Sequence, residues 1–177
     1  MTVDDALTPE ERDFSEIIGD LVEQWGFKRH LGRVWSFLFL RQTPQNPSTL
    51  QKALGISPGN LHSFLNELLH WGVIRKVRIA GERSFFYEVD GPLWQSISNV
   101  IRTRELRILE QAGNKLKSLE DSLHRHGDDR QSIFQAKQIQ HVLLTIDTMK
   151  TLAEIVVASS PKKLERTAKI IQRLRSM

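Results

Sequence analysis

The chain of 177 residues contains no cysteine. Disulfides, thiolate catalysis, thiol redox sensing and cysteine-ligated zinc are therefore excluded. No apolar run approaches the length of a membrane span, since the longest is roughly Val34–Leu40 and Ser36 interrupts it. The N-terminal segment is acidic and lacks the basic and apolar regions of a signal peptide. We therefore expect a cytoplasmic protein that has no membrane partner.

The sequence also lacks the local patterns of common enzyme classes. It has no P-loop, no dinucleotide fingerprint, no nucleophile elbow and no Ser-His-Asp arrangement. Of the six histidines, His124 and His126 are two residues apart, a spacing that places them on different sides of a helix. Zinc needs three or four converging ligands. We predict no enzymatic activity, no metal site and no cofactor.

The net charge of +4 is modest but unevenly distributed. Residues 1–27 carry one base and eight acids, a net charge of −7. Residues 28–90 carry nine bases and four acids, or +5, and residues 91–177 carry fifteen bases and nine acids, or +6. A basic middle segment fits a phosphate-rich partner such as DNA, although charge alone identifies no such protein.

Residues 48–72 have the pattern of two short helices joined by a tight turn. The first is expected to begin at Ser48 as N-cap and to end at Gly55. Ser57 then caps a second helix whose first residue is Pro58, where a missing N–H is harmless. The spacing of apolar residues gives this second helix one apolar face, formed by Leu61, Phe64, Leu65, Leu68 and Leu69.

The opposite face of the second helix carries small polar groups, as a helix in the DNA major groove requires. Asparagine can form two hydrogen bonds with adenine, serine can bind bases or phosphates, and backbone N–H groups at a helix N-terminus suit a phosphate. The alternatives are a solvated helix face and plain capping. The residues predicted to bind DNA here are Ser57, Gly59, Asn60, His62, Ser63 and Asn66.

A basic β-hairpin, the wing, is predicted directly after these helices. Residues 73–79 alternate in the manner of a strand, residues 84–89 are rich in aromatic and β-branched residues, and a loop containing Gly81 separates the two segments. Lys76, Arg78 and Arg83 on this hairpin, with Lys52 before the turn, are predicted to bind DNA phosphates. The alternative is a surface hairpin whose cations only protect an exposed edge. After a helix-turn-helix pattern, the DNA interpretation is favoured.

Two further helices are predicted before this region. The first begins with Thr8 as N-cap and ends at Gly26, with an apolar stripe at Phe14, Ile17, Ile18, Leu21, Val22 and Trp25. The second covers about residues 30–41. Lys28, Arg29 and Arg33 lie near its start. They either contact the DNA backbone or pair with the acidic first helix.

From Leu93 onward the pattern is almost wholly helical. One apolar seam, from Leu109 to Leu123, steps by three and four residues, and Gly127 is expected to end that helix. Asp128 is then the expected N-cap of a second long helix, whose seam is Val142, Ile146, Met149, Ala153 and Val156. Pro161 begins a third. The two long helices can pair within the chain or supply a seam to a second copy. We favour a homodimer, because a two-fold pair matches palindromic DNA sites.

Three segments resemble the GbsR-type branch of the MarR superfamily of transcriptional regulators. They are residues 25–40, 54–68 and 71–88, with Trp25-Gly26-Phe27, Gly32-Arg33, Gly59-Asn60, Trp71-Gly72 and Arg75-Lys76-Val77 as the specific matches. The resemblance implies a winged-helix dimer whose C-terminal helices form the dimer interface. It also implies repression of a nearby operon, relieved in some relatives by small quaternary ammonium compounds. Pro58, His62 and Asn66 depart from the family pattern, which leaves the second helix without lysine or arginine.

Four tryptophans are candidates for binding such an effector through cation–π attraction: Trp25, Trp35, Trp71 and Trp94. Core packing is the alternative, since large aromatic side chains at helical spacing usually fill space between helices.

The sequence thus predicts a mainly α fold: a winged helix-turn-helix with a two-stranded β wing and a C-terminal dimerisation region of long helices. The expected divisions are an N-terminal helix in residues 1–27 that packs on the core or the dimer interface, a DNA-binding domain in residues 28–90, and a dimerisation region in residues 91–177. The expected function is sequence-specific transcriptional regulation, as a repressor, through double-stranded DNA. The competing hypothesis is a winged-helix protein-interaction module that does not read DNA.

Overall fold

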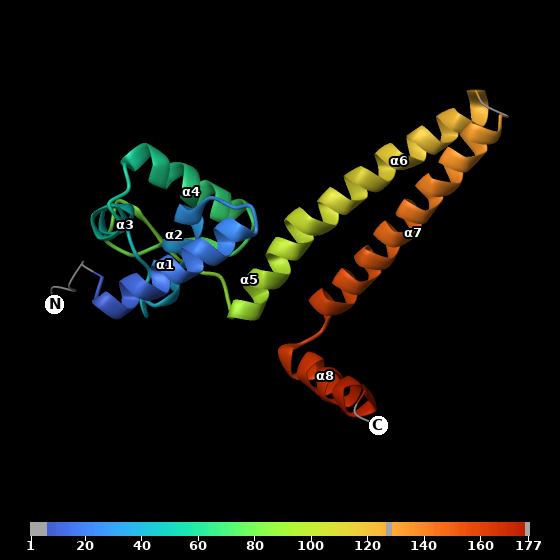
Figure 1. Ribbon diagram of the computed structural model, residues 1–177. Coiled ribbons are helices and arrows are strands. Elements are labelled where there is room, and N and C mark those ends of the chain that lie inside the picture. Colours follow the sequence, from blue (N-terminus) through green and yellow to red (C-terminus); the bar gives the residue numbers. More distant parts are fainter. Residues whose placement is uncertain (1–6, 127–128, 176–177) are drawn as a thin grey trace. The chain divides into compact units, whose positions relative to one another are not determined.

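A computed structural model describes residues 7–126 and 129–175 (Figure 1). The chain divides into two compact units, Met1–Asn99 and Val100–Met177. The predicted helix end at Gly127 and the predicted N-cap Asp128 lie outside the described residues. Within the described residues, no helix is both long and apolar enough to cross a membrane.

The first unit begins with helix α1, Pro9–Gln24, capped as the sequence predicts. The Glu11 backbone N–H donates to Thr8 Oγ1 at 3.2 Å, and the Thr8 N–H donates to Glu11 Oε2 at 2.9 Å. These reciprocal bonds satisfy two donors that a helix start otherwise leaves without partners. The predicted capping box is therefore confirmed.

Helix α2, Arg29–Phe39, packs closely against α1 through two glycines. A Cβ atom added to Gly32 would lie 2.8 Å from the Ile18 carbonyl oxygen and 2.9 Å from the Gly19 Cα. The two backbones therefore touch directly. Because this contact uses small residues, half of the predicted apolar stripe of α1 remains outside the core: Ile17, Leu21 and Trp25 are exposed.

The helix-turn-helix consists of α3, Pro47–Leu54, and α4, Pro58–His70. The predicted N-cap of α3, Ser48, is wrong. Asn46 caps the helix instead, since its Oδ1 accepts from the Thr49 N–H at 2.9 Å and Pro47 occupies the first position. Gly55 follows with φ of +64°, a left-handed conformation that glycine adopts without strain.

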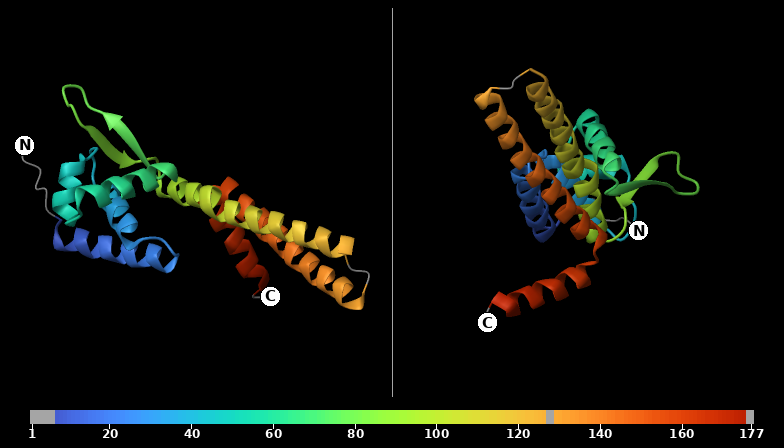
Figure 2. Two further views of the ribbon diagram at one scale, coloured as in Figure 1. Left: turned by 90° about the horizontal axis from the view of Figure 1, so that it is seen from above. Right: turned by 90° about the vertical axis from the view of Figure 1, so that its right-hand side faces the viewer.

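Strands β1, Ile74–Arg78, and β2, Phe85–Val89, form the antiparallel wing seen in green in Figure 2. Ile74 pairs with Val89 and Arg78 with Phe85 at the two ends of the ladder. Gln45, which precedes α3, adds a bridge to Tyr87 through two backbone hydrogen bonds of 2.8 Å. The wing is thus tied to the start of the helix-turn-helix.

The core of the first unit lies among α2, α3, α4 and the base of the wing. Helix α5, Leu93–Val100, closes the unit, and the Asn99 side chain donates from Nδ2 to the Gly72 carbonyl at 2.6 Å. The buried apolar residues include Leu31, Val34, Phe37, Leu38, Leu50, Leu54, Leu61, Leu65, Leu68 and Ile74. This core fixes the orientation of α4 relative to the wing.

The second unit is helical throughout its described part. A π-helical segment, η1, Ile101–Glu105, leads into α6, Leu106–His126, which packs against α7, Arg130–Ala158 (Figures 1 and 2). Asp129 caps α7 by accepting from the N–H groups of Gln131 and Ser132. Helix α8, Pro161–Arg175, follows.

The two long helices pair with each other, but not through the whole predicted seam of α7. Ile146 is buried, and a Cβ on Gly113 of α6 would lie 3.8 Å from its Cγ2. Val142 and Met149 of the predicted seam are exposed, whereas Leu143 and Val157 are buried. The face toward α6 is therefore rotated from the predicted one, because apolar residues occur on more than one side of α7.

Candidate nucleic-acid interface

Helix α4 has one buried face and one exposed polar face. Leu61, Leu65 and Leu68 are buried and hold the helix on the core. The exposed residues on the other side include four that the sequence predicts to contact bases: Asn60, His62, Ser63 and Asn66. Their chemistry supplies both donors and acceptors, as base edges in a major groove require.

The N-terminus of α4 is open and offers backbone N–H groups. Ser57 Oγ accepts from the Asn60 N–H at 3.4 Å, so the cap is present. No atom lies within 4 Å of the position that a Cβ on Gly59 would occupy. Lys52, in the last turn of α3, is exposed. An open helix N-terminus with a nearby cation can accommodate a phosphate group.

The wing holds two of the predicted phosphate-binding cations on one aromatic ring. Lys76 Nζ lies 3.7 Å from the centre of the Phe85 ring, and Arg78 Cζ lies 4.3 Å from it. Both cations are exposed. Cation–π attraction restrains the two long side chains without neutralising their charge. The wing therefore presents a pair of restrained positive charges.

The remaining cations of the wing differ from this pair. Arg75 forms a cross-strand ion pair with Glu88, with 2.7 Å between Arg75 Nη2 and Glu88 Oε1, so its charge is already balanced. Arg83 is exposed in the loop between the strands. At the base of the wing, burial raises the pKa of the Tyr87 hydroxyl, which therefore stays protonated at neutral pH.

Two contacts join the start of α2 to α4. Lys28 Nζ lies 3.0 Å from Glu67 Oε2, and the His30 ring stacks on Phe64 with 5.5 Å between centroids. The first is an exposed ion pair that contributes little stability by itself. Both contacts nevertheless connect the start of α2 to the middle of α4.

At the basic start of α2, two of the three cations have the ion pairs with α1 that were one of the two roles considered for them. Arg29 pairs with Glu16 at 2.8 Å and with Asp20 at 2.9 Å, and Arg33 Nε lies 3.0 Å from Glu16 Oε1. Both arginines thus pair with the acidic helix α1. Lys28 pairs with α4 instead.

The four tryptophans occupy different environments. Trp35 is 9% exposed and stacks on Phe39, with 4.6 Å between centroids. Trp71 meets Phe27 edge to face at 4.8 Å, Trp94 is half-buried, and Trp25 is 58% exposed. Trp35 and Trp71 therefore have the packing role considered for them. Effector binding by the four residues stays a prediction.

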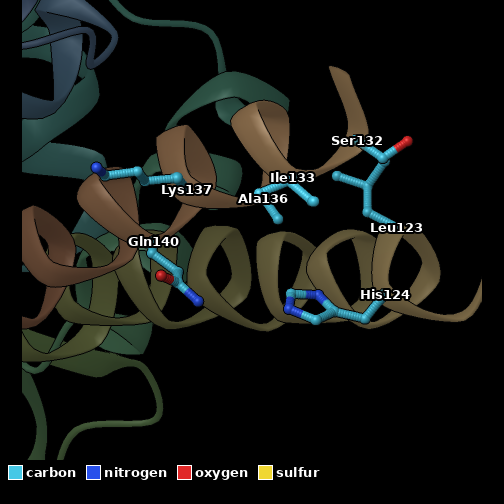
Figure 3. A pocket seen from close by; sticks show the side chains of 7 residues that line it. All are labelled: Leu123, His124, Ser132, Ile133, Ala136, Lys137 and Gln140. Carbon is cyan, nitrogen blue, oxygen red and sulfur yellow. The ribbon is translucent and has the colours of Figure 1, made fainter. Parts of the chain in front are cut away.

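A groove of about 360 Å³ lies between the ends of α6 and α7 (Figure 3). Two of its polar side chains already have partners on the helices: Gln140 Nε2 donates to Glu120 Oε1 at 2.6 Å, and the His124 ring contacts the Glu120 carbonyl at 2.9 Å. We assign it no ligand. Across the described residues, no three histidine, aspartate or glutamate side chains gather as a metal site would need.

Comparison with known proteins supports the fold described above. A solved structure titled "Crystal Structure of a transcriptional regulator" superposes with a TM-score of 0.67 and 18% sequence identity, covering 84% of this chain and 96% of that one. The fold is a winged helix-turn-helix. It carries a C-terminal pair of long helices, as the sequence predicts.

Two curated relatives come from Bacillus subtilis (strain 168). The HTH-type transcriptional repressor OpcR is 23% identical over 129 residues, which are 70% of this chain and 69% of OpcR. The protein named Putative HTH-type transcriptional regulator YvaV is 27% identical over 86 residues, 49% of each chain. Both names denote regulators rather than enzymes. No protein-family model matches the chain.

Two residues outside the predicted set position the interface. Phe85 lies opposite Arg78 in the strand register, and its ring contacts both cations of the wing. An aromatic residue opposite a cation across a short hairpin is the sequence signal for this contact. Gln45 anchors β2 through its bridge to Tyr87. No local signal exists for Gln45, because its partner is more than forty residues away in the chain.

Proposed function

We propose that this chain is a sequence-specific DNA-binding transcriptional regulator that acts as a repressor and as a homodimer. The observation that carries the proposal is the exposed polar face of α4 beside two cations restrained on Phe85. The similarity to regulators named HTH-type supports it. The finer assignment, to the GbsR-type branch of the MarR superfamily, rests on the sequence resemblance and is part of the proposal.

The chemistry of the side chains suggests which residues bind phosphates and which bind bases. Cations neutralise phosphates and set affinity, whereas base-edge contacts set sequence preference. We assign the phosphates to Lys52, Lys76, Arg78 and Arg83, with the backbone N–H groups at Ser57 and Gly59. We assign the bases to Asn60, His62, Ser63 and Asn66. Residues 28–90 then form the DNA-binding domain, residues 1–27 support it, and residues 91–177 serve dimerisation in the cytoplasm.

Helix α7 supports dimerisation because it is apolar on two opposite sides. Ile146 faces α6, and Leu144, two residues earlier, lies about 200° around the helix from it. Leu144 is 67% exposed. Ile155 lies about 20° from Leu144 around the helix and Leu152 about 80°, and both are exposed. A helix with apolar residues all round normally has both sides covered. We propose that a second copy covers this side.

The hydroxyl groups on the exposed side of α7 do not oppose its burial. Thr145 Oγ1 donates to the His141 carbonyl at 2.9 Å, Thr148 Oγ1 to Leu144 at 2.8 Å, and Thr151 Oγ1 to Asp147 at 2.9 Å. Each hydroxyl is satisfied by its own helix. Covering these residues would therefore leave no buried donor without a partner.

DNA binding is tested by fluorescence anisotropy against duplexes from upstream of the chain's own gene, over a range of salt concentrations. Arg78→Ala should weaken binding to every duplex and reduce the salt slope by about one unit. Lys117→Ala, which removes an exposed lysine from α6, is the matched control and should change neither quantity. Equal affinity for all duplexes contradicts a sequence-specific regulator. No DNA binding, with a co-purifying protein, supports the interaction-module alternative.

Dimerisation is tested by measuring mass in solution with light scattering. Leu144→Glu places a charge in the centre of the proposed interface and should shift the protein from dimer to monomer, because an unpaired buried charge is strongly unfavourable. Gln138→Glu adds the same charge at an exposed polar position of α7 and should leave the dimer intact. A Leu144→Glu protein that remains dimeric places the interface elsewhere.

The proposed effector is a small quaternary ammonium compound. Titration calorimetry with choline and with betaine tests it directly. Heat that is lost in Trp25→Ala, the most exposed of the four tryptophans, would support the predicted site, and no heat with either compound would remove the effector from the proposal.

A further inference from the structure

Asn66 and His62 form a side-chain pair on the exposed face of α4. Asn66 Nδ2 lies 2.9 Å from His62 Nε2, and the two residues are one helical turn apart. Both side chains are exposed, and both are among the groups assigned to bases under the proposed function, on which this inference rests.

The chemistry of the pair ties the orientation of the amide to the tautomer of the ring. An amide nitrogen carries two hydrogens and accepts no hydrogen bond. The contact between the two nitrogens is therefore a hydrogen bond in which His62 Nε2 accepts and the ring proton is on Nδ1. In the other neutral tautomer Nε2 carries the proton and would bond Oδ1 of a flipped amide instead. The arrangement in the structure thus holds the amide with Nδ2 toward His62.

The selected orientation leaves Asn66 with the groups that adenine needs. One amide hydrogen is used by His62, while the other hydrogen and the Oδ1 oxygen remain free. In the major groove, adenine presents an acceptor at N7 beside a donor at N6. We propose that His62 is the positioning residue that orients Asn66 to recognise an adenine in the operator.

The experiment begins with wild-type protein and a pool of random duplexes. The position whose base preference disappears in Asn66→Ala identifies the base that Asn66 reads. We expect adenine there, preferred over other bases by about 5- to 150-fold, the range of a good bidentate contact. Replacing that adenine by 7-deazaadenine, which lacks the N7 acceptor, should remove most of the preference.

Variants of His62 then test positioning. His62→Ala frees the amide, so the preference should fall by about 2- to 12-fold, the effect of ordering one free side chain on binding. His62→Gln supplies an oxygen acceptor in place of the ring nitrogen, and it should restore the preference. His30→Gln is the matched control and should keep the wild-type preference.

The result that overturns the inference is a His62→Ala protein with the full wild-type preference, or a base other than adenine at the Asn66 position. Either result leaves the proposed function intact, because the protein still selects a sequence. If no duplex binds more tightly than another, the proposed function itself is wrong. The two failures are therefore distinguishable.

Discussion

The close contact between α1 and α2 predicts that Gly32→Ala destabilises the first unit, although alanine is the better helix former. The added Cβ would lie 2.7 Å from Val22 Cγ2, 2.8 Å from the Ile18 carbonyl oxygen and 2.9 Å from the Gly19 Cα. Two of these atoms belong to the backbone of α1, which cannot rotate away. The helices must therefore separate by several tenths of an ångström, since carbon atoms pack best at about 3.5–4.0 Å.

The magnitude follows from two opposing effects. Overpacking a tight site costs about 1–3 kcal/mol, and the upper end applies where backbone atoms obstruct. Alanine in place of glycine within a helix raises the free energy of unfolding by about 1 kcal/mol through its better helix propensity. We expect a net loss of about 2 kcal/mol in the free energy of unfolding. In urea the midpoint should fall by about 1 M, given a typical dependence of about 2 kcal/mol per molar.

The assay is urea denaturation followed by tryptophan fluorescence. All four tryptophans lie within Met1–Asn99, so the signal reports on the first unit. Gly59→Ala is the matched control: it makes the same substitution in a helix where no atom lies within 4 Å of the new Cβ, and it should stabilise by roughly 0.5 kcal/mol. A Gly32→Ala protein as stable as the wild type would refute the direct backbone contact.

Three other outcomes are expected. Ser36→Ala should raise the free energy of unfolding by about 1 kcal/mol, measured in urea, because the Ser36 hydroxyl is fully buried with no hydrogen-bond partner among the described residues; a loss of stability would show that the hydroxyl is satisfied. Phe85→Ala should weaken binding to every duplex by roughly fivefold without changing sequence preference, because Lys76 and Arg78 lose the aromatic ring that restrains both side chains. Anisotropy that shows weaker binding to one sequence alone would contradict this. Hydrogen bonds from the Ser132 hydroxyl and then from backbone N–H groups lower the pKa of the Asp129 carboxyl below its ordinary value of 3.8. The carboxylate therefore stabilises the fold above pH 3.8, and this stabilisation is lost as the pH falls through the lowered pKa. Asp129→Asn keeps an oxygen that can cap the helix but cannot ionise. The urea midpoint of this variant should therefore not show the loss of stability at acid pH that the carboxylate causes in the wild type.

Local patterns were sufficient to predict most elements of the first unit. The capping box at Thr8, the Ser57 cap with Pro58, and both wing strands follow from spacing within a few residues, and each is present to within about one residue. The predicted helix over residues 30–41 is observed at Arg29–Phe39. Such signals depend only on neighbours along the chain, which a sequence displays directly.

One error arose where two residues near the start of α3 offered the same local signal. Ser48 and Asn46 can both cap a helix, but only Asn46 directly precedes a proline, which prefers the first helical position. A stricter use of the proline preference would have found this cap.

Contacts between distant segments could not be predicted. The sequence of α1 has one apolar stripe, but Gly19 and Gly32 direct the packing to a different side of that helix. The apolar residues of α7 surround the helix, so spacing alone does not identify the side toward α6. For the candidate site, residue types were predictable, whereas the ring of Phe85 beneath two cations and the bond between Asn66 and His62 required three-dimensional coordinates.

The π-helical segment η1, Ile101–Glu105, begins one residue after the first residue of the second unit. A π turn closes its hydrogen bonds over one residue more than an α turn does. Removal of a single residue here can therefore restore regular α-helical bonding without altering the flanking stretches. A single codon at this junction therefore decides whether the backbone from α5 into α6 is hydrogen-bonded as an α-helix throughout.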